Sequence, residues 1–224
     1  MATIATVSPE ELEDPLAYLP CSRVVQYYDG QVIYGVGHPS SQLNLIIEGK
    51  VKVSRVSQNG RQLVVDIYRK DEFFGEYVFL GGHAPAEQAL ALEDTKLMAW
   101  PMKTVEEIIT RQSKLGIALL QLLAQRSLDL NARLESFSVD NIARRLANNL
   151  IRFADRLGKA GTDGSVQMMP FTHELLSQVV GTSREIITHY MNRFRRQGYV
   201  KYSRREIVVY RDALRDWLRQ PAAS

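Results

Sequence analysis

A short segment near the C-terminus sets an arginine beside a glutamate at the start of a predicted helix. The segment 181–200 reads GTSREIITHYMNRFRRQGYV. Three of its apolar residues, spaced by four and three, define one helical face: Ile187, Met191 and Phe194. Arg184 and Glu185 then fall on the exposed face. A guanidinium pairs with the O6/N7 edge of guanine and a carboxylate accepts from the N4 amino group of cytosine, so this first turn has the chemistry to read base edges.

The same face continues with Thr188, His189 and Asn192, and we predict that Thr188 and His189 also contact bases. Thr182 precedes Glu185 by three residues, which is the spacing of a capping box. Glu185 therefore has two open roles, because it can read a base or cap the helix.

Another predicted helix, 171–180, comes just before this one in the chain, and the turn 181–183 joins the two. We place the start of the second helix at Thr182, with Thr182 or Ser183 as its N-cap. Two helices joined by a three-residue turn containing glycine are the helix-turn-helix pattern, whose second helix lies in the DNA major groove. The alternative is a plain helical hairpin with a basic surface.

Further residues around this unit predict contacts with a phosphate backbone. Tyr199–Tyr202 and Ile207–Tyr210 flank the turn 203–206, which is the pattern of a β-hairpin, here called the wing. The residues assigned to phosphate contacts by charge or position are His173, Thr182, Arg193, Lys201, Arg204 and Arg205. The segment 139–224 holds 15 Lys and Arg against 8 Asp and Glu, whereas 1–138 is net acidic. Only the C-terminal part is therefore expected to meet a polyanion such as double-stranded DNA.

The N-terminal part, from about residue 20 to 100, consists of short strand-like runs rich in Val, Ile and Tyr. Turn residues separate the runs, above all Asn59-Gly60, the pair typical of a tight hairpin. Several short strands at this spacing predict a small antiparallel barrel or sandwich. Five aromatic residues are expected in its core: Tyr27, Tyr28, Tyr34, Phe73 and Trp100.

The pattern then changes to helices, a short one over 102–112 and a long one over 114–137. The long helix carries an a/d seam at intervals of four and three: Gly116, Leu120, Leu123, Ser127, Leu130, Leu134 and Phe137. A helix lying on its own barrel would also show such a stripe. A second apolar strip, Leu115, Leu119 and Leu122, is sufficient to cover the barrel. We therefore expect the seam to pair with a second copy of the chain in a homodimer.

Composition and motifs exclude several other classes. The chain has one cysteine, Cys21, so neither a disulfide framework nor a metal site of four cysteines within one chain can form. No apolar run of about 18 residues is present and the N-terminus lacks a secretion signal, so we expect a cytoplasmic protein without membrane contact. P-loop, GxSxG, HExxH and Rossmann patterns are absent, which argues against an enzyme.

Several motifs, in chain order, carry a resemblance to a known family. They are GQVIYGVG, LIIEGKVKV, NGRQ, FFGE at 73–76, RRLANNLIRFA and, most specific, VGTSREIITHYMNRFRRQGYV followed by IVVY. With them the chain resembles the Crp/Fnr family of bacterial transcription regulators along nearly its whole length. The resemblance implies an α+β fold in three parts: an antiparallel β-roll of the cupin-like jelly-roll type over 1–113, a dimerisation helix over 114–137, and a winged helix-turn-helix over 138–224.

Residue by residue, the resemblance matches Arg184 and Glu185 to base-reading positions, and Thr172 and Ser183 to phosphate contacts. His189 stands where close relatives often carry arginine, which leaves the half-site sequence open. The family implies a homodimer on two inverted half-sites about one helical turn apart. It also implies RNA polymerase as a partner, for which the turn Gln58-Asn59-Gly60-Arg61 is a candidate contact, in activation or repression.

The effector is a separate question. Cyclic-AMP-binding members of the family follow the Gly-Glu that matches Gly75 and Glu76 with an Arg-Ser pair, and that Arg holds the cyclic phosphate. Pro85 and Ala86 stand at those positions here, and no Arg or Lys lies between Glu76 and Thr95. A buried phosphate without a cationic partner is costly, so we expect no binding of cyclic AMP. The candidate effector pocket consists of Gly75, Glu76, Leu130 and Asn131.

Other modes of control stay open. The apolar seam through Leu130 and Leu134 would hold the dimer ready for DNA with no effector and no cofactor. Gating by a small metabolite, by redox chemistry or by haem is the alternative. Cys21 is expected to be buried or inert, and His38 and His83, which could ligate haem, are expected at the surface. A cyclic-nucleotide-binding regulatory module is the third reading, but it would not need the basic winged end.

Overall fold

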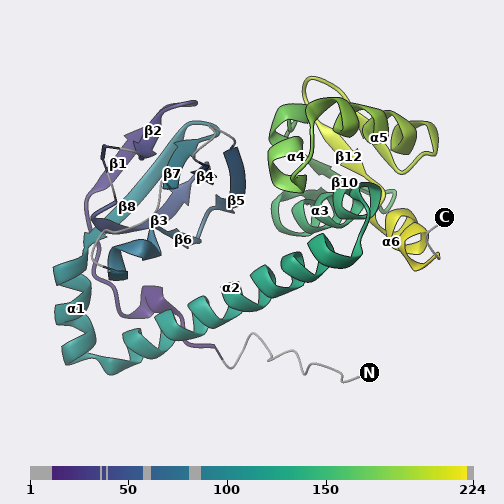
Figure 1. Cartoon of the computed structure of the whole chain (residues 1–224). Coiled ribbons are helices and arrows are strands. Elements are labelled where there is room, and N and C mark those ends of the chain that lie inside the picture. The colour runs from purple at the N-terminus through teal and green to yellow at the C-terminus, as the bar shows by residue number, and fades with distance from the viewer. Residues whose placement is uncertain (1–11, 36, 39, 58–61, 81–86, 221–224) are drawn as a thin grey trace. The chain divides into compact units, whose positions relative to one another are not determined.

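Figure 1 shows the computed structural model of the chain, which describes residues 12–35, 37–38, 40–57, 62–80 and 87–220. The chain divides into two compact units, Met1–Val53 with Ile67–Leu134, and Ser54–Asp66 with Glu135–Ser224. Among the described residues, no helix is both long enough and apolar enough to cross a membrane.

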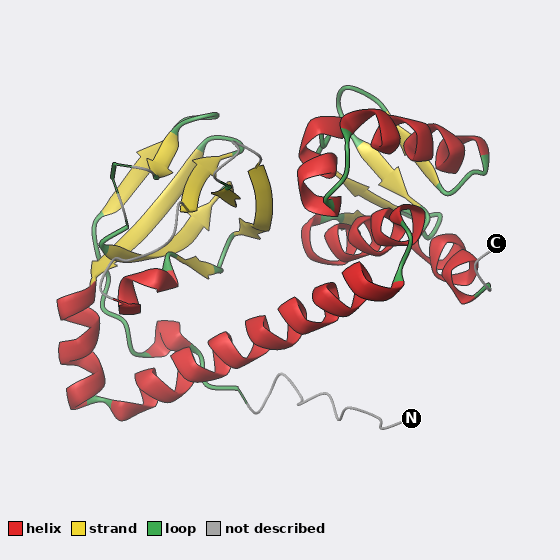
Figure 2. Cartoon of the chain, in the orientation of Figure 1, coloured by secondary structure: helices red, strands yellow, loops and turns green. Residues whose placement is uncertain are grey.

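Up to the long helix, short strands come first and helices follow, whereas strands and helices alternate in the rest of the chain (Figure 2). The elements up to the long helix are η2 (Pro15–Ala17), β1 (Val24–Tyr27), β2 (Val32–Tyr34), β3 (Gln42–Glu48), β4 (Lys50–Val56), β5 (Gln62–Arg69), β6 (Phe73–Phe74), η3 (Glu76–Leu80), β7 (Glu87–Ala91), β8 (Thr95–Pro101), α1 (Met102–Arg111) and α2 (Ser113–Val139). The remaining elements are α3 (Ile142–Leu157), β9 (Lys159–Ala160), β10 (Val166–Met168), α4 (His173–Val180), α5 (Arg184–Arg196), β11 (Val200–Tyr202), β12 (Ile207–Val209) and α6 (Arg211–Arg219).

Two four-stranded sheets form the β-roll, in the orders β1-β8-β3-β6 and β2-β7-β4-β5. β8 runs antiparallel to both β1 and β3, with Leu45 of β3 opposite Met98 of β8. The antiparallel architecture predicted from the short strands is confirmed. The predicted turn at Asn59-Gly60 lies outside the described residues.

One hydrophobic cluster joins the strands to the two helices that follow them. Its buried members are Leu43, Leu45, Phe73, Trp100, Val105, Leu115 and Leu119. Leu115 and Leu119 belong to the strip of α2 that was expected to cover the barrel, and Leu122 packs against the same cluster. The Trp100 indole N–H donates to the carbonyl of Pro20 at 2.8 Å, so its polar group is satisfied inside the core.

Two expectations about the β-roll are wrong. Tyr28 is 64% exposed and not in the core, because it comes just before the turn at Asp29-Gly30, where its carbonyl accepts from the Gln31 N–H. Of the two alternatives expected for Cys21, buried or inert, the buried one is wrong, because Cys21 is exposed in the irregular segment that precedes β1. That its thiol is inert stays a prediction. Tyr34, Phe73 and Trp100 are buried as predicted.

The second unit packs its helices on the sheet β11-β12-β10-β9. Fully buried side chains of three of its helices, α3, α4 and α5, include Leu146, Leu150, Phe153, Leu176, Met191 and Phe194. α3 begins at Ile142, since the Asn141 side chain caps it by accepting from the Arg144 N–H at 3.0 Å. α6 was not predicted. Trp217 of α6 packs edge-on against Phe194 of α5, with ring centroids 5.3 Å apart.

Within this unit, the last turns of α2 meet the turn between α4 and α5. The Arg145 guanidinium lies 4.9 Å from the centroid of the Phe137 ring. Gly181 ends α4 in the left-handed conformation, with φ of 72°, and a Cβ there would lie 2.9 Å from Cε1 of Phe137. Glycine is therefore required both by the backbone and by the neighbouring ring.

Replacing Gly181 by alanine is expected to lower the free energy of unfolding by roughly 2–4 kcal/mol, because the left-handed strain and the overpacking against Phe137 add together. Gly198→Ala is the matched control, since Gly198 has φ of 77° with no atom within 4 Å of the added Cβ. The free energy of unfolding of the control should fall only by the cost of the left-handed backbone, about 1–2 kcal/mol. Urea unfolding of the two variants measures the difference, and equal losses would show that Phe137 imposes no constraint on this turn.

Candidate nucleic-acid interface

Side-chain caps define where the two helices of the helix-turn-helix begin. The Thr172 hydroxyl accepts from the Leu175 N–H at 3.0 Å and starts α4. The Ser183 hydroxyl accepts from the Ile186 N–H and starts α5 at Arg184. The predicted start at Thr182 is therefore wrong by two residues, since Thr182 belongs to the turn and its N–H donates to the carbonyl of Ser177.

α5 has one buried face and one bare face. Ile187, Met191 and Phe194 have no exposed surface, as their spacing predicted. Arg184, Glu185 and His189 are exposed on the other side. The bare face thus offers a guanidinium, a carboxylate and an imidazole within the first two turns.

Glu185 is held as a carboxylate at the start of α5. Its own backbone N–H, the Ser183 hydroxyl and the nearby Arg184 guanidinium lower its pKa, in that order of size. A carboxylate at a helix N-terminus also suits the positive end of the helix dipole. Both predicted roles are compatible with this geometry, because the side chain engages the cap and is still fully exposed.

Thr188 is half-buried and differs from its exposed neighbours on α5. Its hydroxyl donates to the carbonyl of Arg184 at 2.9 Å, and Nδ1 of His173 lies 2.8 Å from the same oxygen. Since a hydroxyl has one proton to give, Nδ1 of His173 must be the donor in the second bond. Burial, and then the nearby Arg184, lower the pKa of His173. His173 is therefore neutral near pH 7 and engaged with α5.

A tyrosine of the wing, which no sequence pattern marks as functional, continues this network. The Tyr202 hydroxyl donates to Oδ1 of Asn192 at 3.0 Å. The His173 ring meets the Tyr202 ring at a centroid distance of 5.5 Å, and the Arg195 guanidinium lies 5.2 Å from the Tyr202 centroid. Residues of α4, α5 and β11 are thus tied together on one side of the unit.

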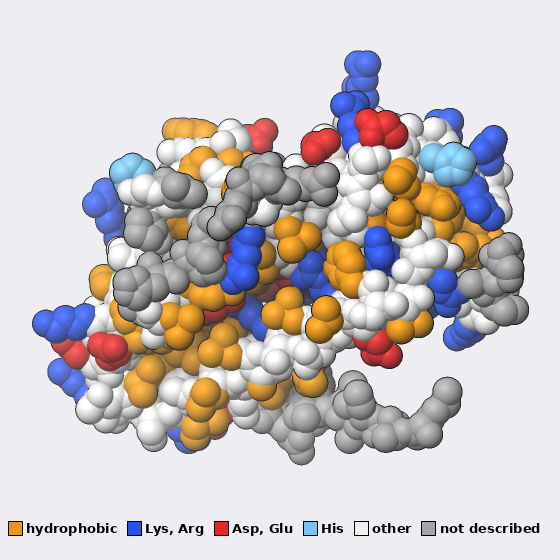
Figure 3. Space-filling model, viewed as in Figure 1, with side chains coloured by type: hydrophobic (Ala, Val, Ile, Leu, Met, Phe, Trp, Pro, Cys, Tyr) orange, Lys and Arg blue, Asp and Glu red, His pale blue; other side chains and the backbone are white. Residues whose placement is uncertain are grey.

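The predicted basic residues of the wing are exposed. Ser203 shapes the turn, as its N–H donates to the carbonyl of Glu206 and its hydroxyl accepts from the Arg205 N–H. Arg204 and Arg205 project from this turn, and Figure 3 shows basic side chains standing out there with acidic ones beside them. The hydrogen bond with Tyr210 raises the pKa of Lys201, so the lysine stays cationic. Arg193 is exposed near the end of α5.

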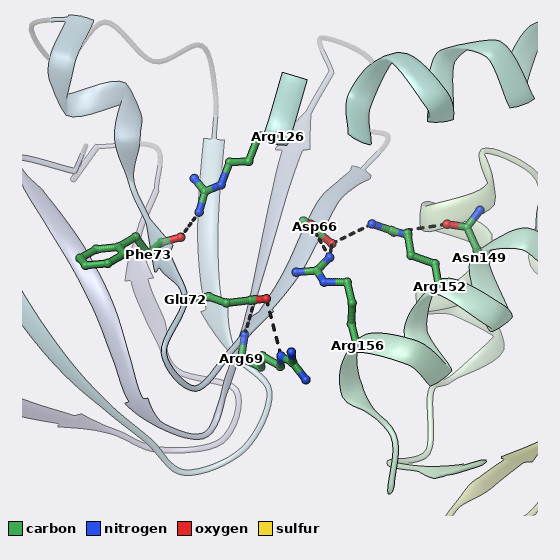
Figure 4. Close-up of polar contacts among 8 residues, drawn as sticks. All are labelled: Asp66, Arg69, Glu72, Phe73, Arg126, Asn149, Arg152 and Arg156. Atoms are coloured by element: carbon green, nitrogen blue, oxygen red, sulfur yellow. Dashed lines mark hydrogen bonds and ion pairs between the residues drawn. The ribbon is translucent and has the colours of Figure 1, made fainter. Parts of the chain in front are cut away.

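Two other arginines of this unit are paired with a carboxylate. Asp66, which belongs to the same unit, lies 3.1 Å from Nη1 of Arg152 and 2.7 Å from Nη1 of Arg156 (Figure 4). One carboxylate thus offsets part of the positive charge of these two arginines, which are engaged within the unit. α5 and the wing carry exposed positive charge at Arg184, Arg193, Lys201, Arg204 and Arg205, where base or phosphate contacts are predicted.

Most of the predicted seam on α2 is exposed in the single chain. Leu120, Leu123, Leu130, Leu134 and Phe137 are exposed large apolar side chains, and Ser127 is exposed between them. Figure 3 shows apolar side chains along the visible side of this helix. Gly116 differs, since a Cβ there would lie 3.3 Å from the side chain of Ile109 in α1. The uncovered part of the seam therefore begins at Leu120.

The candidate effector pocket contains a cation that the sequence did not predict. Arg126 of α2 donates to the carbonyl of Phe73 (Figure 4). It also pairs with Glu76 at 2.8 Å and lies 4.8 Å from the centroid of the Tyr68 ring. Leu130 and Asn131, which were expected to approach this place, are exposed. The residue of α2 that the structure brings to Glu76 is thus Arg126, one helical turn earlier.

Further carboxylate charge lies close to Glu76. The Tyr34 hydroxyl donates to the buried Glu87 carboxylate at 2.7 Å. Burial, and then Glu87 with a smaller effect of Glu76, raises the pKa of Tyr34 well above its ordinary value. Gly75 lies in a tight turn here with φ of 87°, and a Cβ at this position would lie only 2.9 Å from Nδ2 of Asn44. Both carboxylates act on the same tyrosine, and negative charge at this place disfavours an incoming anion.

Residues that could hold haem or a metal are not brought together in the described part of the chain. No group of three or more His, Cys, Asp and Glu side chains suited to a metal ion occurs there. His38 is exposed, as expected, and His83 lies outside the described residues, as do Pro85 and Ala86.

Two family models match the chain. A cyclic nucleotide-binding domain matches residues 24–112, and a Crp-like helix-turn-helix domain matches residues 144–217. The second match contains α4, the turn, α5 and the wing.

Known proteins match nearly the full length of the chain. A cyclic AMP receptor protein of Thermus thermophilus is 26% identical over 208 residues, or 93% of this chain and 92% of that protein. The structure of FixK2 from Bradyrhizobium japonicum matches with a TM-score of 0.75 at 18% identity and covers 90% of this chain and 99% of its own. A transcriptional regulator of the CRP/FNR family from Thermus thermophilus matches with a TM-score of 0.68 at 23% identity and covers 88% and 99%.

The lowered pKa of His173 predicts a pH dependence of stability. The unfolded chain takes up a proton at the ordinary pKa of histidine, whereas the folded chain takes it up only at lower pH. The contribution of His173 is therefore complete above the unfolded pKa and declines as the pH falls from about 7 toward the folded pKa. Urea unfolding of the full chain between pH 7.5 and pH 5 measures it. His173→Gln should flatten this part of the profile, and identical profiles for the two proteins would contradict the assignment.

Proposed function

Since the chain belongs to the Crp/Fnr family of transcription regulators and carries a Crp-like helix-turn-helix domain, we propose that it binds a palindromic promoter site as a homodimer and needs no cyclic AMP. It is not an enzyme but a DNA-binding regulator. It works in the cytoplasm, where it recruits or blocks RNA polymerase.

The bare face of α5 is the observation that carries the proposal. Arg184 and Glu185 stand exposed on its first turn, directly after the Ser183 cap. The N-terminal residues of the second helix are the ones that contact base edges in helix-turn-helix proteins. Arg184 is assigned to the O6/N7 edge of guanine and Glu185 to the N4 amino group of cytosine.

The apolar seam supports the homodimer. The row of exposed leucines from Leu120 to Leu134 is followed by Phe137 along one side of α2. Such a row is stable in water when a second helix of the same kind covers it. A two-fold pair of chains presents two copies of α5, so the DNA site has two inverted half-sites.

The polar contacts of Arg126 support independence from cyclic AMP. The Arg126 guanidinium is already engaged by the Glu76 carboxylate, and Glu87 adds a second carboxylate nearby. A cyclic phosphate at Glu76 would have to compete with that ion pair and to approach both carboxylates. The same contacts tie α2 to the segment around Phe73 without a ligand, which favours a constitutively DNA-competent protein.

A regulator gated by a small molecule is the second candidate. The match of residues 24–112 to a cyclic nucleotide-binding domain favours it.

Replacing Arg184 by alanine is expected to relax the choice of one guanine in each half-site by about 1–3 kcal/mol, because the guanidinium supplies the two donors that read O6 and N7. Selection of bound sequences from a random DNA pool, followed by competition binding, measures this loss. Arg204→Ala is the control. Loss of a phosphate contact should weaken binding to all DNA sequences alike and reduce the salt dependence of the binding constant by about 1 in slope. An unchanged sequence preference in Arg184→Ala would show that the assignment is wrong.

Replacing Leu130 by glutamate is expected to break the dimer and to lower DNA affinity at least about tenfold, because two like charges would face each other across the seam. Leu128→Glu is the matched control. Leu128 is 54% exposed and Leu130 is 51% exposed, but Leu128 lies off the seam. Sedimentation velocity should give a monomer for the first variant and a dimer for the second. A wild-type protein that sediments as a monomer would defeat the dimer proposal.

The ligand-free protein is expected to bind its selected site specifically. Added cyclic AMP should change the dissociation constant for that site by less than about twofold, since a coupling of one kcal/mol would already change it about fivefold. Fluorescence anisotropy with and without the nucleotide measures this. Stimulation by cyclic AMP of tenfold or more would contradict the proposal and favour the ligand-gated candidate.

A further inference from the structure

Asn192 lies on the side of α5 that also carries the base-reading residues, yet its amide is held from within the protein. Asn192 is half-buried, whereas Arg184, Glu185 and His189 are exposed. Its Oδ1 atom accepts a hydrogen bond from the Tyr202 hydroxyl at 3.0 Å. Tyr202 comes from the wing strand β11, so an element outside the helix-turn-helix controls this side chain.

The atom that Tyr202 engages is one that adenine recognition requires. Asparagine reads adenine with two bonds, in which Oδ1 accepts from the N6 amino group and Nδ2 donates to N7. The Tyr202 hydroxyl uses Oδ1 and fixes the orientation of the amide plane. One lone pair of Oδ1 stays available, but the two-bond contact needs the amide plane to lie along the adenine edge, and the bond to Tyr202 sets that plane from within the protein.

Tyr202 is itself fixed on two sides. The His173 ring packs against the Tyr202 ring in an edge-on arrangement, with centroids 5.5 Å apart. The Arg195 guanidinium lies 5.2 Å from the Tyr202 centroid, within the range of a cation–π contact. The hydroxyl is thus aimed at Asn192 by residues of α4 and α5, not by the wing turn alone.

Thr188 is engaged in the same network. Its proton goes to the carbonyl of Arg184, and its oxygen accepts from His173. Thr188 therefore has no proton left to donate to a base. Two half-buried polar residues of the outer side, Thr188 and Asn192, are thus hydrogen-bonded within the same group of residues.

We infer that Tyr202 is a specificity-determining residue of the DNA-binding domain, which holds Asn192 away from the bases and so leaves base reading to Arg184, Glu185 and His189. The inference rests on the proposed function, because it concerns the same face of α5. Tyr202 acts through Asn192 and is a positioning residue without a base contact of its own.

Selection from a random DNA pool with four full-length proteins tests the inference: the wild type, Tyr202→Phe, Asn192→Ala and the double variant. Tyr202→Phe keeps the ring and removes only the hydroxyl that engages Asn192. It should gain a preference for adenine at one position of each half-site, of about fivefold or more, since a bidentate pair discriminates by about 1–3 kcal/mol. Asn192→Ala should keep the wild-type preference, and the double variant should return to it.

Tyr210→Phe is the matched control, because it removes a hydroxyl from another aromatic residue near the wing that interacts with Lys201. It should leave the preference unchanged. A loss of stability from Tyr202→Phe would be shared by the double variant, so the return of the wild-type preference separates positioning from mere folding. Thermal unfolding of all variants checks that shared loss.

Three results would overturn the inference: an unchanged preference in Tyr202→Phe, an adenine preference that persists in the double variant, or a changed preference in Asn192→Ala alone. A wild-type protein that selects no sequence would instead overturn the proposed function, and the inference with it. The two failures are therefore distinguished by the wild-type selection.

Discussion

The bare face of α5 depends on the burial of its opposite face. Ile187, Met191 and Phe194 have no exposed surface, and their spacing of four and three residues fixes the rotation of the helix about its axis. With that rotation fixed, the first turn must present Arg184 to solvent. Phe194 is held in turn by Trp217 of α6. Aromatic packing behind α5, more than the charge in front of it, thus decides which side chains are available for recognition.

The local parts of this arrangement could be predicted from the sequence because they depend on period and on neighbouring residues. The interval of the apolar residues gave the orientation of α5, and the second apolar strip of α2 gave its packing on the β-roll. The cap at Asn141 and the left-handed residue Gly181 follow from residue types at short range. α6 was missed although Leu214 and Trp217 have helical spacing, since it is short and both of its ends are basic.

The contacts between distant residues could not be predicted in this way. Arg126 meets Glu76 across 50 positions of the chain, and no short-range pattern marks either residue as the partner of the other. Tyr202 was assigned to a wing strand from its β propensity, yet its hydroxyl selects the conformation of Asn192. The absence of a cation between Glu76 and Thr95 was read correctly, but the cation near Glu76 comes from another element. Side-chain chemistry at such places depends on tertiary packing, which a single sequence does not encode locally.

The most direct test of the account is a dimethyl sulfate footprint of the full-length protein on its selected site, because methylation at guanine N7 reports on the major groove. The account predicts protection of guanine N7 at two symmetric places whose centres are separated by about one turn of the duplex, roughly 10–10.5 base pairs. Protection at one place alone would contradict the pairing of two α5 helices. A bound complex that leaves every guanine N7 reactive would contradict the assignment of Arg184 and of α5 to the major groove.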